Sequence, residues 1–347
     1  MDHTNRQIWN FIKYRSGITD LSFGQFINDA TANPQKYKQD FWAINCALDQ
    51  FPYQSLAELV KRHDLHTNCA FLISCPEIAQ NYQHLNFRYF PYFIAEGIAQ
   101  IKKQDDLCNP DIDFEHRSNR LSCVNRFARY HRVYTYYLLC QQPNLGDAKF
   151  SFTKLETKLP DSNGLLHPVN LTIEELLKVA LQRNYYSEHF ESWLRKEYPH
   201  WPRQIEDYEP TTSNDTRLKC LAFGDSYANI VTETYVDDFV PTEKVVKPLL
   251  AGCLFMPVAS ANYMKKLENI GFDLQFEGID YQQYDTLPTW MQRSEKVVEM
   301  TNAVYPDFED IWCKNRERLT HNRNLFFSKT LEDHVIQQVT DIFEVNY

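Results

Sequence analysis

The stretch 227–259, YANIVTETYVDDFVPTEKVVKPLLAGCLFMPVA, contains the pattern that decides the fold class. Its first apolar run predicts a strand that ends at Glu233. Thr242 can then cap a helix that reaches about Ala251 and stops at Gly252, although Pro248 inside it should weaken or kink the helix. The second apolar run, LFMPVA, predicts another strand. A strand, a helix and a strand in this order are typical of an α/β domain with a parallel sheet.

The same alternation extends through the rest of the chain. Residues 1–45 are expected to be helical. From the end of this region on, short apolar runs predict strands at 43–48, which overlaps it, at 69–75, near 89, at 121–124 and near 148–152. Amphipathic stretches predict helices at 56–62, at 126–141 and at 173–183, and a further helix that follows the strand near 89 and ends at 101. A Thr172–Glu175 capping box is expected to begin the helix at 173–183. A final helix at 331–343 is expected to dock on the body through Leu331, Val335, Val339 and Ile342.

A polar segment, 104–119, lacks a periodic apolar face and is the best candidate for a linker. It divides the chain into an N-terminal α/β domain (1–115) and a C-terminal α/β domain (116–310). The helices of 311–347 are expected to pack back on the body. The predicted fold class is therefore α/β, with two Rossmann-like domains that face a cleft and with extra N- and C-terminal helices.

Composition narrows the classes of function. The chain has 347 residues and a net charge of −10, which argues against broad binding of nucleic acid. Its nine cysteines are scattered and form no C-x-x-C pair, so free thiols are expected and no metal site is predicted. No apolar stretch is long enough to span a bilayer, and the N-terminus does not read as a secretory signal. We expect a cytoplasmic protein. Glycine fingerprints of nicotinamide enzymes and of P-loop enzymes are missing from the sequence.

A concentration of cations in this acidic chain calls for an explanation. Residues 125–132, NRFARYHR, directly follow a predicted strand and open a predicted helix. Cations there oppose the helix dipole, at about 0.3–1 kcal/mol each. A bound anion would reverse that cost, because amide donors, the dipole and guanidinium groups all favour phosphate. We therefore expect phosphate binding by Asn125, Arg126, Arg129, His131 and Arg132, with a solvated basic helix start as the alternative.

The second segment of interest is Thr242-Glu243-Lys244, at the start of a predicted helix. A carboxylate in this position can accept bonds from both hydroxyls of a ribose, and a lysine beside it can neutralise a phosphate. Such a helix start is common, so its functional interpretation depends on the neighbouring residues. Asp237-Asp238 is expected to belong to a solvated loop, because no third carboxylate is present at a metal-binding spacing.

The spacing of this segment from Glu233, together with the residues after it, resembles the donor-binding motif of the α1,3-fucosyltransferases. Glu233 and Glu243 are ten positions apart, and a helix, Ala-Gly, an apolar strand and Ala-Asn-Tyr come next. The matching positions are Glu233, Thr242, Glu243, Lys244, Leu250, Ala251, Gly252, Pro257, Ala261, Asn262 and Tyr263. The match covers about 40 residues. The sequence departs from the family at Val240-Pro241 and at Ala259-Ser260.

The resemblance implies a glycosyltransferase of the GT-B type that inverts the anomeric carbon and needs no metal. By this resemblance Glu243 would bind the ribose, Lys244 the diphosphate, and Glu233 would line the donor sugar. The donor would be a nucleotide sugar, a GDP-sugar being favoured, carrying fucose or a related sugar. No other cofactor is implied. The acceptor would be a hydroxyl of a glycan or of a glycolipid precursor, which leaves room for peripheral association with a membrane.

An inverting transfer needs a carboxylate base on the acceptor side. Asp49 and Glu77 come after predicted strands of the N-terminal domain and are the candidates, with Glu96 as a third. An ordinary surface acid is the alternative for each of them. Two other functions stay open: a protein of the same fold that binds nucleotide sugar or glycan without turnover, and a sugar transferase that modifies nucleic acid.

Overall fold

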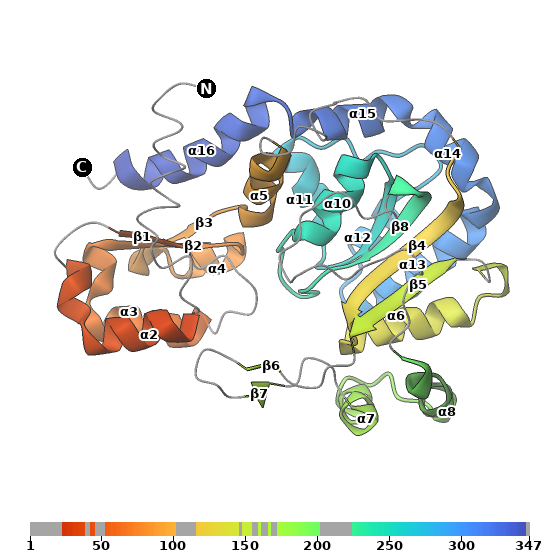
Figure 1. Ribbon diagram of the computed structural model, residues 1–347, viewed down its shortest axis with the longest axis horizontal. Helices are drawn as coiled ribbons and strands as arrows, with labels where there is room; N and C mark the ends of the chain where they lie inside the picture. Colours follow the sequence, from red (N-terminus) through yellow and green to blue (C-terminus); the bar gives the residue numbers. More distant parts are fainter. Residues whose placement is uncertain are drawn as a thin grey trace. The chain divides into compact units, whose positions relative to one another are not determined.

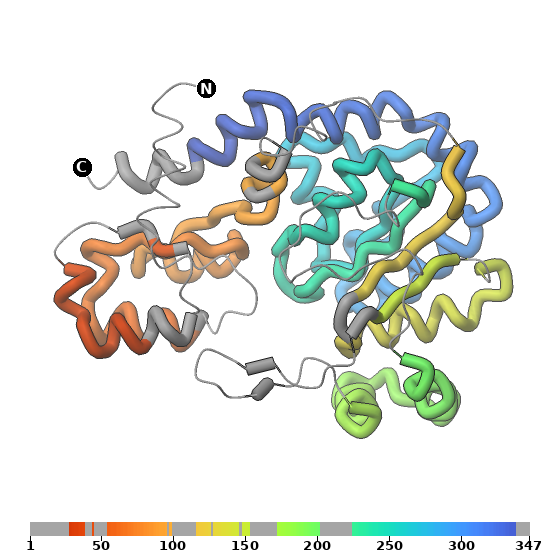
Figure 2. Tube along the Cα trace, in the orientation of Figure 1, coloured from red at the N-terminus to blue at the C-terminus, as the bar shows by residue number. Residues whose placement is uncertain are grey.

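The computed structural model of the chain describes residues 23–38, 42–45, 53–101, 116–145, 148–154, 159–160, 166–167, 172–201 and 224–344 (Figure 2). Their contacts divide the chain into two compact units. The smaller unit comprises 1–95, 160–166 and 329–347, and the larger one comprises 96–159 and 167–328. The predicted boundaries at 115 and 310 stay a prediction. Both units are of the α/β class, with parallel sheets.

The larger unit is built on a four-stranded sheet of described strands in the order β5-β4-β8-β9. These strands are β4 (Asn119–Phe127), β5 (Lys149–Lys154), β8 (Ser226–Thr232) and β9 (Leu254–Val258). All three pairings are parallel. Every residue of β8 and β9 is buried, as expected for a parallel sheet covered on both faces.

The strand order contains a point at which the direction of winding reverses. From β4 the chain moves outward to β5, then returns past β4 to form β8 and moves the other way to β9 (Figure 1). The connection after β4 includes α6 (Tyr130–Cys140), and the connection after β8 is α10 (Glu243–Ala251). Such a reversal between neighbouring strands is the topological switch point of doubly wound sheets.

The helices of the larger unit cover this sheet. On one side α6 packs against α13 (Trp290–Val304), and elsewhere α10 packs against α15 (Arg316–Leu325). Next to α6 lie α7 (Ile173–Gln182) and α8 (Glu188–Glu197) (Figure 1). The other described helices of this unit are α11 (Tyr263–Ile270), α12 (Gln282–Asp285), α14 (Phe308–Lys314) and the short 3-10 helices η5 (Pro143–Leu145), η6 (Tyr198–His200) and η7 (Tyr305–Asp307).

The smaller unit has a three-stranded parallel sheet in simple sequential order, β1-β2-β3. The strands are β1 (Trp42–Asn45), β2 (Cys69–Ile73) and β3 (Phe87–Tyr89), and α3 (Tyr53–His63) and α4 (Pro76–Asn81) connect them. A buried apolar core joins them, with Leu56, Val60 and Phe71 among its fully buried members. The unit also contains α2 (Phe23–Ala32), η1 (Pro34–Lys38), η2 (Leu65–Thr67), η3 (Gln83–Leu85) and α16 (Lys329–Glu344). The helix α5 (Tyr92–Ile101) includes the point at which the chain passes from one unit to the other, and β6 (Leu159–Pro160) pairs with β7 (Leu166–His167).

Most elements agree with the sequence-based prediction, and two do not. The expected strand–helix–strand of 227–259 is present, and Gly252 adopts the left-handed conformation (φ 62°) at the end of α10. The Thr172–Glu175 capping box is present in full. Residues 42–45 form a strand, which agrees with the strand predicted at 43–48 where that stretch is described; the helix predicted up to residue 45 was wrong there. The prediction that a helix starts at Arg126 was also wrong. The strand β4 continues to Phe127, and α6 begins at Tyr130.

The predicted docking face of the last helix is confirmed where the structure describes its side chains. Leu331 and Val335 are each 1% exposed, on α16. The side chains of Val339 and Ile342 lie outside the described part. The larger portion of the predicted linker, 104–115, is outside it as well.

Candidate functional site

The two segments singled out by sequence meet at the switch point of the larger sheet. Asn125 lies near the C-terminal end of β4, and Arg129–Arg132 come directly after that strand. Glu233 follows β8, and Thr242 precedes α10. Because β4 and β8 are parallel neighbours, their C-terminal ends lie at the same edge of the sheet. In open α/β sheets this edge, at the switch point, is where ligands bind.

Hydrogen bonds join the two segments residue by residue. The Thr232 hydroxyl donates to the side-chain oxygen of Asn125. His131 Nε2 lies 2.8 Å from the backbone carbonyl of Glu233, and Arg129 Nη1 donates to the carbonyl of Thr234 at 3.2 Å. Three consecutive residues, 232–234, at and after the end of β8 are thus held by Asn125 near the end of β4 and by Arg129 and His131 at the start of α6. The chain segments at this edge of the sheet are therefore fixed relative to each other.

The carboxylate of Glu233 organises the beginning of α10. One oxygen accepts from the Thr242 backbone N–H at 3.0 Å and from the Tyr263 hydroxyl at 2.7 Å. The other accepts from the Thr242 hydroxyl at 2.5 Å and from the Thr234 N–H at 3.2 Å. Glu233 is fully buried. Burial raises its pKa, and Lys244 and the donated bonds act in the opposite direction.

These contacts bear on the role that the resemblance implies for Glu233. Both of its oxygens are occupied by donors of the protein itself, and no part of its side chain reaches the surface. In this structure the residue fixes the helix start. It does not present a free carboxylate to a sugar.

Lys244 lies at the same helix start, closer to solvent. Its ammonium group contacts the hydroxyls of Thr234 (3.1 Å) and Thr242 (3.3 Å) and the carboxylate of Glu243 (2.6 Å). The side chains of Lys244 and Glu243 are 18% and 17% exposed. Burial alone would raise the pKa of Glu243, but the charge and the hydrogen bond of Lys244, together with the charge of Lys247, outweigh burial and lower it to about 2. The pair is therefore charged and borders on solvent.

His131 and Arg132, in the first turn of α6, are buried rather than solvated. A carbonyl oxygen only accepts hydrogen bonds, so the bond to Glu233 places the proton of the neutral imidazole on Nε2. Nδ1 has no hydrogen-bond partner among the described residues. Burial, followed by the charge of Arg132, lowers the pKa of His131 well below its usual range. The histidine is thus a neutral element of the site.

The remaining residues of this basic segment differ in their placement. Arg129 occupies the N-cap position of α6 with extended backbone and is half-buried. Arg126 lies within β4, and its side chain is outside the described part. Tyr130 is half-buried, with the Trp290 ring centroid 5.4 Å and the guanidinium of Arg183 4.4 Å from its own ring centroid. Tyr263 and Thr234 bond residues of this site, and Arg183 contacts Tyr130; none of the three was among the predicted site residues.

The candidate base Glu77 lies in the smaller unit, in the first turn of α4 and shortly after β2, as predicted. Its carboxylate accepts from the buried Cys75 thiol at 3.3 Å. Tyr89, at the end of β3, was not predicted. Its buried hydroxyl has no hydrogen-bond partner among the described residues, and burial and the charge of Glu77 raise its pKa. Asp49 and the side chain of Glu96 lie outside the described part of the structure.

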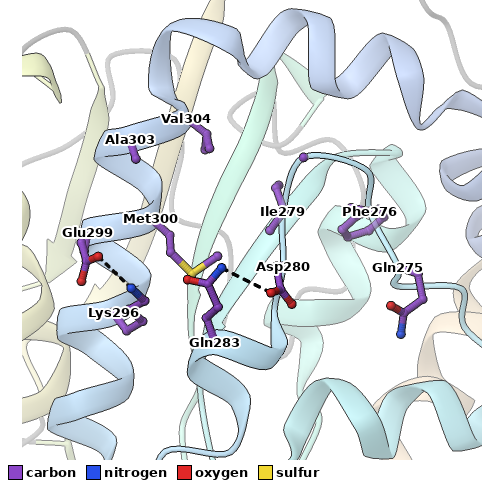
Figure 3. Close-up of a pocket in the computed structure, with 11 residues that line it drawn as sticks. Gln275, Phe276, Ile279, Asp280, Gln283, Lys296, Glu299, Met300, Ala303 and Val304 are labelled. Carbon is purple, nitrogen blue, oxygen red and sulfur yellow. Dashed lines mark hydrogen bonds and ion pairs between the residues drawn. The ribbon is translucent and has the colours of Figure 1, made fainter.

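A pocket of about 560 Å³ lies elsewhere in the larger unit (Figure 3). It is lined by Gln275, Phe276, Gly278, Ile279, Asp280, Gln283, Lys296, Glu299, Met300, Ala303 and Val304. Four of its polar side chains bond in pairs, Lys296 to Glu299 at 2.7 Å and Gln283 to Asp280 at 3.3 Å. None of the predicted site residues lines this pocket. Its wall uses the second half of α13, whereas Trp290, at the first residue of that helix, packs against Tyr130.

Other features of the described residues bear on a metal site, on disulfides and on a membrane span. It contains no group of three or more histidine, cysteine, aspartate or glutamate side chains that could hold a metal ion. Asp237 is exposed and Asp238 is partly exposed, in the loop after β8. Cys69, Cys75, Cys123, Cys140, Cys253 and Cys313 are free thiols. Among the described helices, none combines the length and the apolar character that crossing a membrane would require.

Comparison with family profiles, with curated proteins and with solved structures finds no match to this chain.

Proposed function

We propose that the larger unit binds the nucleoside diphosphate part of a nucleotide sugar, and that the protein is an inverting, metal-independent glycosyltransferase of the GT-B type. The observation that carries the proposal is the convergence of two cations on Thr234. Arg129 Nη1 bonds its carbonyl oxygen and Lys244 Nζ bonds its hydroxyl, at 3.2 and 3.1 Å. One cation comes from the β4 end and the other from the helix start after β8, at the switch point.

Physical chemistry supports a diphosphate as the ligand. The chain carries a net charge of −10, so a pair of cations held together at a ligand-binding edge is unusual for this protein. Arginine and lysine beside helix N-termini favour phosphate through charge-assisted bonds and the helix dipole. In the transfer reaction the acceptor oxygen bonds the anomeric carbon while the bond from that carbon to the phosphate oxygen breaks. Arg129 and Lys244 would stabilise the negative charge that develops on the departing diphosphate.

The remaining roles are inferred from the placement of each residue. Glu243, held beside Lys244 at the solvent boundary, is suited to accept bonds from the ribose hydroxyls. Glu233 and Thr242 position the start of α10 without touching the ligand. The acceptor hydroxyl must lose a proton to a base, and Glu77 and Asp49 stay the candidates. We propose a glycan or glycolipid-precursor hydroxyl as acceptor and a GDP-sugar as donor, on the basis of the motif resemblance.

Calorimetric titration with GDP, UDP, CDP and dTDP tests donor binding. Wild type is expected to bind at least one of them, and Lys244→Ala and Arg129→Ala each to weaken that binding about tenfold, the size of one lost charge-assisted contact. Lys265→Ala is the matched control, because Lys265 is 64% exposed and pairs only with Glu268 in the described structure. Absence of binding to all four nucleotides, or equal affinity in both variants and wild type, would overturn the proposal.

Turnover requires a separate measurement. Release of GDP from a GDP-sugar, measured with and without glycan acceptors and in the presence of EDTA, distinguishes transfer from binding alone. Asp49→Asn or Glu77→Gln is expected to abolish release while leaving the affinity for GDP unchanged, because a base acts on the acceptor and not on the diphosphate. Donor binding without release under any condition would indicate a non-catalytic binding protein.

A further inference from the structure

A third cation lies beside the proposed diphosphate site, on an element that the motif does not include. Arg183 comes directly after α7, and its guanidinium stacks over the ring of Tyr130, 4.4 Å from the centroid. The residue itself is exposed. Tyr130 is the first residue of α6 and is adjacent to Arg129. The stack therefore places Arg183 at the same helix N-terminus that carries Arg129.

The turn between α7 and α8 holds Arg183 in place. The backbone N–H of Arg183 donates to the carbonyl of Val179 at 2.9 Å, and Asn184 adopts the left-handed conformation (φ 58°) that reverses the chain. Tyr185 is buried against the rings of Tyr134 (centroids 4.8 Å apart) and Trp290 (5.5 Å). Both α7 and α8 pack against α6 (Figure 1). The position of Arg183 is thus set by the packed aromatic cluster beneath it.

The charges around Arg183 leave it available to an anion. No described carboxylate lies within ion-pairing distance of its guanidinium, in contrast to Arg195 on α8, which pairs with Glu191 at 2.8 Å. Stacking on a tyrosine orients a guanidinium and leaves its N–H groups, which lie in the plane, free to donate. Arg183 and Arg129 both act electrostatically on Tyr130, as does the exposed carboxylate of Asp237. Two guanidinium groups at one tyrosine favour a bound anion.

We propose that Arg183 is a further anion-binding residue of this site, positioned by Tyr130, and that it contacts the second phosphate of the nucleoside diphosphate. The proposal rests on the proposed function. Arg129 and Lys244 are joined through Thr234, and Arg183 is joined to this pair through Tyr130. The three cations thus come from three separate segments: the β4 end, the start of α10 and the α7–α8 turn. A ligand with two linked phosphates could contact more of them at once than a monophosphate could.

The test compares GDP with GMP by calorimetry in wild type, Arg183→Ala, Tyr130→Leu and the double variant. Arg183→Ala is expected to weaken GDP binding about five- to tenfold and to change GMP binding by less than about twofold, because the monophosphate lacks the second phosphate group. Tyr130→Leu should reproduce part of this loss of selectivity, since the guanidinium loses its platform. The double variant should be no weaker than Arg183→Ala, as expected for two residues that act through one contact.

Two controls distinguish a direct contact between Arg183 and the ligand from a long-range effect of charge and from loss of the fold. Arg195→Ala removes the same charge from the neighbouring helix and is expected to leave both affinities unchanged. Unchanged melting temperatures of the variants would establish that the fold persists. Equal losses in Arg183→Ala and Arg195→Ala would indicate a long-range charge effect and overturn the inference.

The outcome also distinguishes this inference from the proposed function. If Lys244→Ala weakens GDP binding while Arg183→Ala binds like wild type, the diphosphate site stands and the role of Arg183 is refuted. If wild type binds neither GDP nor the other three diphosphates, the proposed function fails, and the inference fails with it.

Discussion

The carboxylate of Glu233 bonds both the backbone N–H and the hydroxyl of Thr242, the residue that caps α10. A buried acid at the end of one strand therefore fixes the first turn of the helix that leads to the next strand. The Tyr263 hydroxyl adds a third donor from the beginning of α11. Glu243 and Lys244 come directly after Thr242, so the geometry of the proposed diphosphate site depends on a residue that is itself buried.

Replacing Glu233 by alanine is expected to destabilise the protein by about 3 kcal/mol or more, because buried donors of Thr242 and Tyr263 would lose their acceptor at once. Denaturation by urea measures this free energy of unfolding. Glu299→Ala is the control, since Glu299 is 68% exposed and should contribute less than about 0.5 kcal/mol. A loss of under about 1 kcal/mol in Glu233→Ala would mean that water replaces these bonds.

A second prediction concerns Gly278, in the loop that lines the pocket. Its φ is +89°, and a Cβ built on it would lie 2.9 Å from Cγ1 of the Ile311 side chain. Gly278→Ala therefore combines an unfavourable backbone conformation with a steric clash, and is expected to cost about 2 kcal/mol. Gly224→Ala is the matched control, because nothing lies within 4 Å of the corresponding Cβ. Equal melting temperatures for the two variants would refute the prediction.

The fold class could be predicted from sequence because its signals are local. Every residue of β8 and β9 is buried, so both strands appear as largely apolar runs, and Thr242 and Gly252 mark the ends of α10. The start of α6 gave no such signal. Its N-cap is Arg129, which makes no capping bond from its side chain, and β4 continues to Phe127, which pairs with Lys154 of β5. Strand pairing is a tertiary contact and leaves no local pattern.

The candidate site was likewise predictable in part. The residue types and the spacing of two segments pointed to an anion, and the structure joins these segments through His131 and Arg129. Neither segment contains a sequence signal for the strand order that makes β4 and β8 neighbours. The contacts of Tyr263 with Glu233 and of Arg183 with Tyr130 connect residues distant in sequence, so neither could be inferred from a pattern. The burial of Glu233 was also not foreseen.

The third prediction is a specific dependence of stability on pH through His131. Burial, followed by the charge of Arg132, lowers the pKa of this histidine in the folded state. In the unfolded chain its pKa is about 6.5. Between these two values the unfolded chain binds more protons, so protonation favours unfolding. The contribution of His131 to stability is therefore complete above about pH 6.5. It is lost as the pH falls further, by up to about 1.4 kcal/mol per pH unit.

His131→Gln isolates this contribution, because an amide N–H can still donate to the carbonyl of Glu233 but does not titrate in this range. Urea denaturation of both proteins at about pH 7.5, 6.5 and 5.5 gives the comparison. Between the two lower values wild type should lose about 1 kcal/mol more than the variant. The pKa of Glu233 is raised on folding, so its effect on stability has the opposite sign, but it is present in both proteins and cancels in the difference. Parallel profiles for the two proteins would show that His131 takes up a proton without cost in the folded state.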